Sequence, residues 1–171
     1  MVSLGAVAVN QVGEEYEIGA RFYVEIRPTS ERVDLGAMAV NGLDIDDLRA
    51  NGLDMADALE RLTQWANEQT LEGTIPVFVG HNAPFDWSFV NYAYASCAMP
   101  NPFGYKALDT KALAMGVLGV HWLDANKELL EVELGLPQPV ADQVHRADYD
   151  AWYQALILVG LLKRMPAIAG R

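Results

Sequence analysis

A short apolar run between two helical patterns constrains the fold of this chain more than any other feature. The run TIPVFVG, residues 74–80, has the length of a strand and is almost entirely apolar. Such a run is typical of a strand buried on both faces of a sheet. Apolar residues with helical spacing precede it at 55–69 and follow it at 84–99. The sequence therefore predicts a sheet covered by helices.

Two further strands are expected at the N-terminus. The segment MVSLGAVAV (1–9) is rich in small and β-branched residues, and residues 20–28 alternate apolar with polar side chains. A polar, glycine-containing turn, NQVGEEYE (10–17), lies between them, so the two segments predict an antiparallel hairpin. Residues 105–109 predict a fourth, weaker strand.

The rest of the chain predicts helices and loops. Residues 29–53 are expected to be a loop with short helical turns, and Asp54 is expected to begin the helix over 55–69. Further helices are expected at 84–99, 110–118, 123–134 and 146–165. This order of elements predicts a single α/β or α+β domain over residues 1–171, with a mixed sheet flanked by helices.

Composition excludes several classes of protein. Asp and Glu total 23 against 12 Lys and Arg, giving a net charge of −11, so the chain lacks the basic surface of a duplex-binding protein. The single cysteine, Cys97, excludes an internal disulfide and a cysteine-based zinc site. No apolar stretch is long enough to cross a membrane, and a cytoplasmic location is the default expectation.

Two similar motifs carry the candidate chemistry. HNAPFD (81–86) and HRADYD (145–150) each place a histidine five residues before an aspartate, at an expected helix start. Taken singly, each is better explained as an ordinary first-turn acid after a loop histidine. Taken together, carboxylates from separate elements suit Mg²⁺ or Mn²⁺. A neutral histidine can also deprotonate water, and two metals can assist phosphodiester cleavage. Asp86, His145 and Asp150 are therefore the candidate catalytic residues.

These two motifs resemble the second and third motifs of the DEDD 3′→5′ exonuclease superfamily, which includes ribonuclease T, oligoribonuclease and proofreading domains. The histidine five residues before the last aspartate is typical of the His-type branch. Tyr149 has the wrong offset for the Tyr-type branch. The resemblance extends to residues 1–9, 21–28 and 108–114. It implies a ribonuclease H-like fold.

The resemblance also implies residue roles. Asp150 would bind the nucleophile-side metal, Asp86 would support the second metal, and His145 would be the general base. Ala147 would be the small residue that lets this loop and helix approach closely. The candidate substrate-binding residues, which would shape a pocket for the 3′ end, are His81, Asn82 and Phe85.

Other roles stay open for these and neighbouring residues. Asn82 is equally a helix cap, Phe85 a core anchor and His81 a structural residue. Asp109 and Thr110 are interpreted as a strand-end acid and a helix N-cap, without chemistry. Core packing is expected for at least two of four aromatic residues that could otherwise stack on bases, namely Trp87, Phe89, Tyr92 and Tyr94.

One part of the family pattern has no counterpart. The first family motif, Asp-x-Glu on the central strand, would precede residues 2–9, and only Met1 does so here. We therefore expect an N-terminally shortened domain without its central strand, and an incomplete two-metal site. A start within a longer natural chain, an inactive homologue, and a strand supplied by a partner chain are the alternative explanations.

The expected function is a metal-dependent 3′→5′ exonuclease that removes nucleoside monophosphates from single-stranded DNA or RNA ends, using Mg²⁺ or Mn²⁺. With two acids absent, little activity is expected from these 171 residues. The alternative is an inactive exonuclease-like module that binds nucleic acid or protein, and a homodimer is compatible with either. An unrelated α/β hydrolase has little support, because the sequence lacks a Gly-x-Ser-x-Gly elbow and a phosphate-binding glycine loop.

Overall fold

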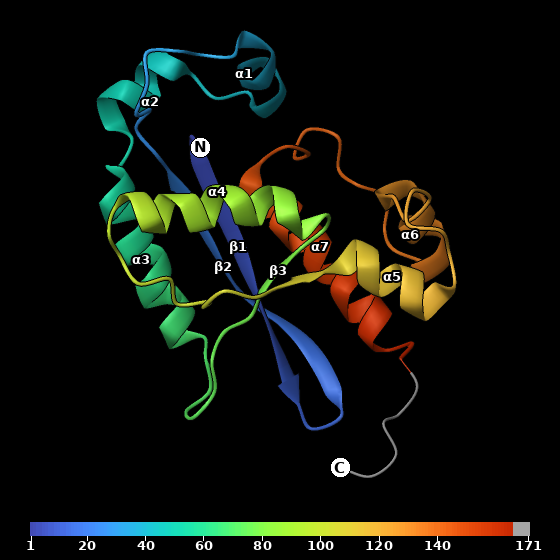
Figure 1. Ribbon diagram of the computed structural model, residues 1–171. Helices are drawn as coiled ribbons and strands as arrows, with labels where there is room; N and C mark the ends of the chain where they lie inside the picture. Colours follow the sequence, from blue (N-terminus) through green and yellow to red (C-terminus); the bar gives the residue numbers. More distant parts are fainter. Residues whose placement is uncertain (166–171) are drawn as a thin grey trace.

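The computed structural model describes residues 1–165 and contains four strands and seven helices in that range (Figure 1). None of its helices is long and apolar enough to cross a membrane. In chain order the elements are β1 (Ser3–Val12), β2 (Glu15–Glu25), α1 (Leu35–Asn41), α2 (Ile45–Asn51), α3 (Met55–Glu68), β3 (Phe78–Gly80), α4 (Ala83–Ser96), β4 (Ala107–Asp109), α5 (Thr110–Leu118), α6 (Lys127–Leu134) and α7 (Ala147–Leu162).

The N-terminal hairpin is confirmed and is longer than predicted. β1 and β2 pair antiparallel from Ser3↔Glu25 to Val12↔Glu15, so most of the predicted turn is strand. The true turn is two residues long, and Gly13 takes the positive φ of 63° that tight hairpins favour. The far end of this ribbon is exposed on both faces, which is why polar side chains are tolerated there.

The predicted strand over 74–80 is only partly correct. β3 begins at Phe78 and pairs in parallel with β4, from Phe78↔Ala107 to Gly80↔Asp109. Ile75 and Val77, expected to be buried on both faces, are 78% and 58% exposed. The physical reason is that β3 has a strand neighbour on one side only, so the preceding residues have no sheet to enter.

Most helices begin where the sequence predicts. α5 matches its prediction, and α4 has a proline in its first turn as expected. α6 starts at Lys127 rather than at 123, because the Asn126 side chain caps it by accepting from the Leu129 N–H. Asp109, and not Thr110, is the N-cap of α5.

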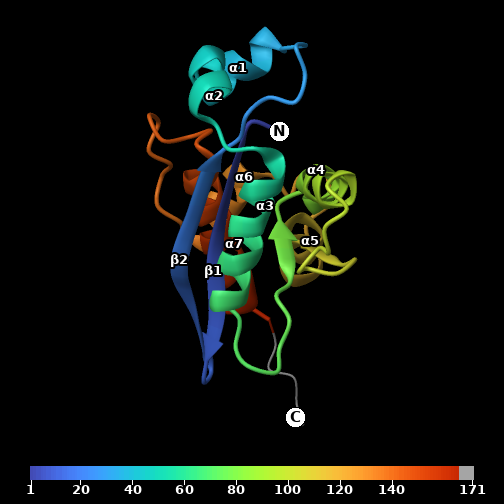
Figure 2. The same cartoon turned by 90° about the vertical axis from the view of Figure 1, so that its left-hand side faces the viewer.

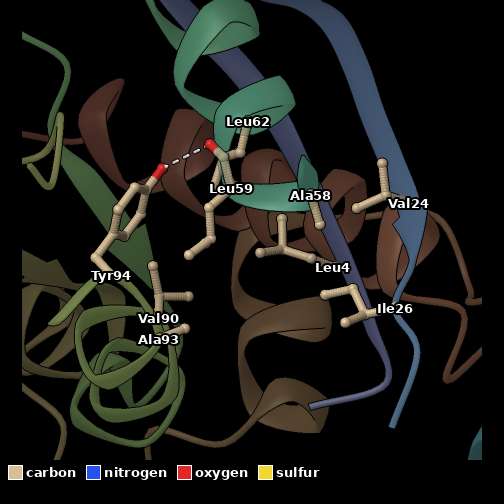
Figure 3. Packing of buried hydrophobic residues seen from close by; sticks show 9 residues of the cluster. All are labelled: Leu4, Val24, Ile26, Ala58, Leu59, Leu62, Val90, Ala93 and Tyr94. Carbon is tan, nitrogen blue, oxygen red and sulfur yellow. Dashed lines mark hydrogen bonds between the residues drawn. The ribbon is translucent and has the colours of Figure 1, made fainter. Parts of the chain in front are cut away.

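Two hydrophobic clusters divide the interior. The first joins the hairpin to α3 and α4, and Tyr94 seals it by donating a hydrogen bond to the Leu59 carbonyl at 3.3 Å (Figure 3). Its buried members are Leu4, Val24, Ile26, Ala58, Leu59, Leu62, Val90, Ala93 and Tyr94. The second cluster joins α5, α6 and α7, with Ala114, Ala125, Leu130, Tyr153, Ile157 and Leu161.

The expected mixed sheet is present as two separate pairs of strands. β1–β2 and β3–β4 are not hydrogen-bonded to one another within residues 1–165. β1 and β3 point in opposite directions (Figure 2). A groove of about 880 Å³ is lined by both strands, from residues 1–11 and 74–80. The unpaired edges of two half-sheets therefore border one cavity.

Candidate active site

The groove brings three sequence-predicted residues together. Asp86 lies in the first turn of α4, directly after β3, and Asp150 lies in the first turn of α7. His145 precedes α7 in the loop, and all three residues line the groove between β1 and β3. Two motifs far apart in the sequence thus contribute to one site.

The turn that presents Asp86 is held in place by Asp109, for which the sequence predicts no catalytic role. Asn82 adopts a left-handed φ of 60° at the N-cap of α4. The Asp109 Oδ1 accepts from the backbone N–H groups of Asn82 at 2.9 Å, Ala83 at 3.3 Å and Lys111 at 3.0 Å. One carboxylate therefore ties the β3–α4 turn to the start of α5. The only sequence signal was an acid at a strand–helix joint.

The environment of Asp86 disfavours its charged form. Burial raises the pKa of the Asp86 carboxyl above its ordinary value, and the negative charge of Asp150 raises it further. A hydrogen bond from its own backbone N–H and the positive charge of Lys127 lower this pKa by less than burial raises it, and each outweighs the effect of Asp150. Burial is therefore the dominant cause of the raised pKa of Asp86.

Replacing Asp86 by Asn is expected to raise the melting temperature at pH 7 by a few degrees. A raised folded-state pKa means that Asp86 stabilises the fold at acidic pH, and this stabilisation is lost as the pH rises through the folded-state pKa. The gain from Asp86→Asn should therefore shrink toward zero as the pH falls to about 3, where both states bind the proton.

Thermal melts of both proteins between pH 3 and pH 8 measure this difference. Asp57→Asn is the matched control, because Asp57 is an exposed acid in the first turn of α3. It should not raise the melting temperature. A lower melting temperature for Asp86→Asn at pH 7 would contradict the expectation.

The loop before α7 is fastened to that helix. The Tyr149 hydroxyl accepts from the Val140 N–H at 2.8 Å, and the Tyr153 hydroxyl donates to the Pro137 carbonyl at 2.9 Å. His145 has a left-handed φ of 73°, and its N–H points to the Asp150 Oδ1 at 3.5 Å. The strained backbone of His145 thus turns the loop back over the acid that follows it.

The three predicted substrate-binding residues occupy different surroundings. His81 does not line the groove; its Nδ1 lies 3.1 Å from the Thr110 Oγ1 and its backbone N–H donates to the Gln154 Oε1 at 3.0 Å. Burial is the main cause that lowers the pKa of His81, with Lys127 and Lys111 adding to it. These contacts match the structural alternative for His81.

Asn82 lies beside the groove, and Phe85 lies in it. Asn82 occupies the N-cap position of α4, as the cap alternative expects, but its side chain makes no capping hydrogen bond. Phe85 lines the groove, is 62% exposed and packs edge-on against Phe89, with ring centroids 5.2 Å apart. Phe85 is therefore not a core anchor.

The other aromatic residues of α4 divide as expected. Tyr94 is buried in the first cluster, and Trp87 packs against Phe78 with ring centroids 5.1 Å apart. Phe89 and Tyr92 are 47% and 74% exposed. Exposed aromatic rings therefore begin beside Asp86 and continue along one side of α4.

The carboxylates of the groove make only part of a metal site. Asp86 and Asp150 are oxygen donors of the type that Mg²⁺ and Mn²⁺ prefer. Within residues 1–165, however, no group of three or more His, Cys, Asp or Glu side chains lies close enough to hold a metal ion. The described residues therefore do not by themselves fit a two-metal centre.

Comparisons with known proteins agree on one family. The exonuclease family model RNase T matches residues 1–158. The chain is 38% identical over 156 residues to the 3′-5′ DNA exonuclease Cap18 of Escherichia coli, covering 91% of this chain and 78% of that protein. The crystal structure of the nuclease domain of 3′hExo, a DEDDh family member bound to rAMP, superposes with a TM-score of 0.73 at 13% identity, covering 94% of this chain and 92% of that one. The structural likeness shows a ribonuclease H-like exonuclease fold.

Proposed function

Because this chain belongs to the exonuclease family RNase T, within the DEDD 3′-5′ exonuclease superfamily, we propose that its groove is the active site of a 3′→5′ exonuclease that releases nucleoside monophosphates from single-stranded ends. The observation that carries this proposal is the meeting of Asp86, His145 and Asp150 in one groove. They come from two motifs far apart in the chain, and together they supply two carboxylates and a base.

His145 is proposed to activate the attacking water. Its imidazole accepts a proton from the water, whose oxygen then forms a bond to the phosphorus of the last phosphodiester. The bond from phosphorus to the 3′ oxygen of the preceding nucleotide breaks, and that oxygen keeps the electron pair and takes up a proton from solvent to become a 3′ hydroxyl. The last nucleotide is released as a 5′ monophosphate. The backbone N–H of His145 lies 3.5 Å from the Asp150 Oδ1, and this contact holds the histidine beside the aspartate.

The substrate is proposed to be a single strand, and its last bases are proposed to stack on exposed rings. Phe85 and Phe89 line the groove and present aromatic faces next to Asp86. Stacking on aromatic side chains suits unpaired bases of any sequence. The DNA substrate named for the Escherichia coli relative favours DNA over RNA.

The site is proposed to be completed by one further strand between β1 and β3. Both edges bordering the groove lack a strand partner within the described residues, and buried unpaired N–H and C=O groups are costly. A strand that enters there and carries the family's Asp-x-Glu acids would add carboxylates opposite Asp86 and Asp150. Mg²⁺ or Mn²⁺ is proposed for that completed site.

A catalytically inactive binding module is the second candidate function. The observation that favours it is the lack of a three-ligand metal group within residues 1–165. Such a module would keep the groove and the exposed rings of α4 but would not cleave. Unpaired edges also favour self-association through strand pairing, so a homodimer belongs to either proposal.

Mn²⁺-dependent melting separates the two functions. A ligand that binds only the folded state stabilises it by about 2.7 kcal/mol at a hundred times its dissociation constant. The 171-residue chain is expected to bind weakly, with a small rise in melting temperature that Asp150→Asn abolishes. Asp142→Asn, an exposed loop acid outside the groove, should leave the rise unchanged.

The same melts are then repeated with a form that carries the added strand. A large rise that depends on Asp150 is expected if the groove is an exonuclease site. No rise, or a rise that survives Asp150→Asn, would favour the inactive module. An oligonucleotide panel of single-stranded DNA, single-stranded RNA and duplex, assayed with Mn²⁺, identifies the substrate.

A further inference from the structure

β1 and α7 approach one another closely at Gly5, next to the proposed base. A Cβ atom placed on Gly5 of β1 would lie 2.2 Å from the Ala147 backbone carbon and 2.3 Å from both the Ala147 oxygen and the Asp148 nitrogen. These are backbone atoms of the first turn of α7, so no side-chain rotation can relieve the overlap. Only glycine fits at this crossing.

We propose that Gly5 is a positioning residue, which sets the distance between Asp86 on one side of the groove and the His145–Asp150 pair on the other. The sequence predicts that Ala147 is the small residue that lets this loop and helix approach closely. The structure places the requirement on the strand, because the contact is made by the Ala147 main chain. Gly5 and Ala147 both line the groove.

The two hydrophobic clusters explain why this crossing controls the site. The hairpin that contains Gly5 shares the first cluster with α3 and α4, and α4 carries Asp86. α7, which carries Asp150, shares the second cluster with α5 and α6. Packed cores resist deformation. The turn that carries Asp86 is also hydrogen-bonded to the helices of the second cluster, to α5 through Asp109 and to α7 through the His81 N–H and Gln154. A displacement where β1 meets α7 therefore strains these bonds and shifts Asp86 relative to Asp150.

The size of the displacement follows from the contact distances. Ordinary contacts of a Cβ atom begin at 3.4 Å, so Gly5→Ala must part strand and helix by about 1 Å or more. A misplacement of about 1 Å in a catalytic geometry can cost about a hundredfold in rate. This inference rests on the proposed function for its rate effect, but not for its geometric effect.

The test compares three alanine substitutions of glycine. In Gly52→Ala the added Cβ would meet the Leu48 oxygen at 2.5 Å and the Arg27 nitrogen at 2.7 Å, which is a similar overlap outside the groove. In Gly19→Ala, on β2 of the same hairpin, the nearest atom is at 3.6 Å, an ordinary contact. Gly52→Ala therefore measures how much a backbone overlap away from the groove changes stability and structure. Gly19→Ala measures the effect of replacing a glycine by alanine where no overlap arises.

Backbone amide NMR shifts of the 171-residue chain give the geometric readout. Gly5→Ala is expected to shift the amides of residues 145–151 and of Asp86, whereas Gly52→Ala and Gly19→Ala leave them in place. Equal shifts at these residues in Gly52→Ala would overturn the proposal. So would a Gly5→Ala protein that fails to fold while Gly52→Ala folds, because Gly5 would then serve the fold in general.

The rate readout uses the form completed by the added strand. kcat is expected to fall about a hundredfold in Gly5→Ala, with KM little changed and a melting temperature no lower than that of Gly52→Ala. If the amides move and kcat does not, the positioning role is wrong. If the unsubstituted completed form has no activity, the proposed function fails, and the amide shifts still decide the geometric claim.

Discussion

A form of this chain extended by one strand bearing Asp-x-Glu ahead of Ser3 is expected to cleave single-stranded oligonucleotides at least about a thousandfold faster than the 171 residues alone. Residues that act as one catalytic unit lose most of the rate when any member is removed. The groove holds Asp86, His145 and Asp150, but within the described residues no three His, Cys, Asp or Glu side chains lie close enough together to hold a metal ion.

The geometry of the groove explains how such a strand would be seated. β1 is ten residues long and is linked to β2 by a turn of two residues. A similar short turn ahead of Ser3 would lay an added strand antiparallel to β1, on the edge that faces β3. Both half-sheets would then be hydrogen-bonded into one, and the cost of their unpaired edges would be removed.

A second extension separates folding from chemistry. The same strand with Asn-x-Gln in place of Asp-x-Glu should pair equally well and raise the melting temperature, yet leave cleavage near the level of the unextended chain. The assay follows release of monophosphates with Mn²⁺ present. Equal cleavage by the two extensions, or robust cleavage by the unextended chain, would contradict the expectation.

Local patterns account for most of the fold that could be predicted. The alternation of Phe22, Val24 and Ile26 identified the end of β2, where Val24 and the following Ile26 are buried and Phe22 is half-buried. Capping residues and prolines in the sequence predicted where most helices begin. Residues 74–77 were wrongly expected to be buried, because an apolar run shows only that burial would be favourable. Whether burial occurs depends on a neighbouring strand, which lies elsewhere in the fold.

The sequence predicted some residues of the candidate site but not others. Motif spacing selected Asp86, His145 and Asp150, and the structure brings them to one groove, whereas their roles stay predictions. Asp109 and Gly5 were not recognised, because their significance lies in tertiary contacts. The Asp109 carboxylate accepts from two separate turns, and Gly5 matters only where α7 crosses β1. The sequence shows Asp109 only as an acid at a strand–helix joint, and it shows no pattern that marks Gly5.

Replacing His145 by Asn in the completed form is expected to lower kcat by about a hundred- to ten-thousandfold, the usual contribution of a general base. Asn suits the left-handed φ of 73° at this position better than most residues, so the loop should keep its shape. The amide of Asn accepts protons poorly, so the attacking water would lose its base. KM and the Mn²⁺-induced rise in melting temperature should change little, because His145 is not proposed as a metal ligand.

Two further variants make the assignment specific to the imidazole of His145. His121→Asn changes an exposed histidine outside the groove and should leave kcat unchanged. His145→Gly, which also tolerates the positive φ, should regain part of its rate when free imidazole is added to the assay. If His145→Asn instead keeps its kcat, or loses rate only in step with its melting temperature, His145 is a structural loop residue, and the base must be sought among the other groups that line the groove.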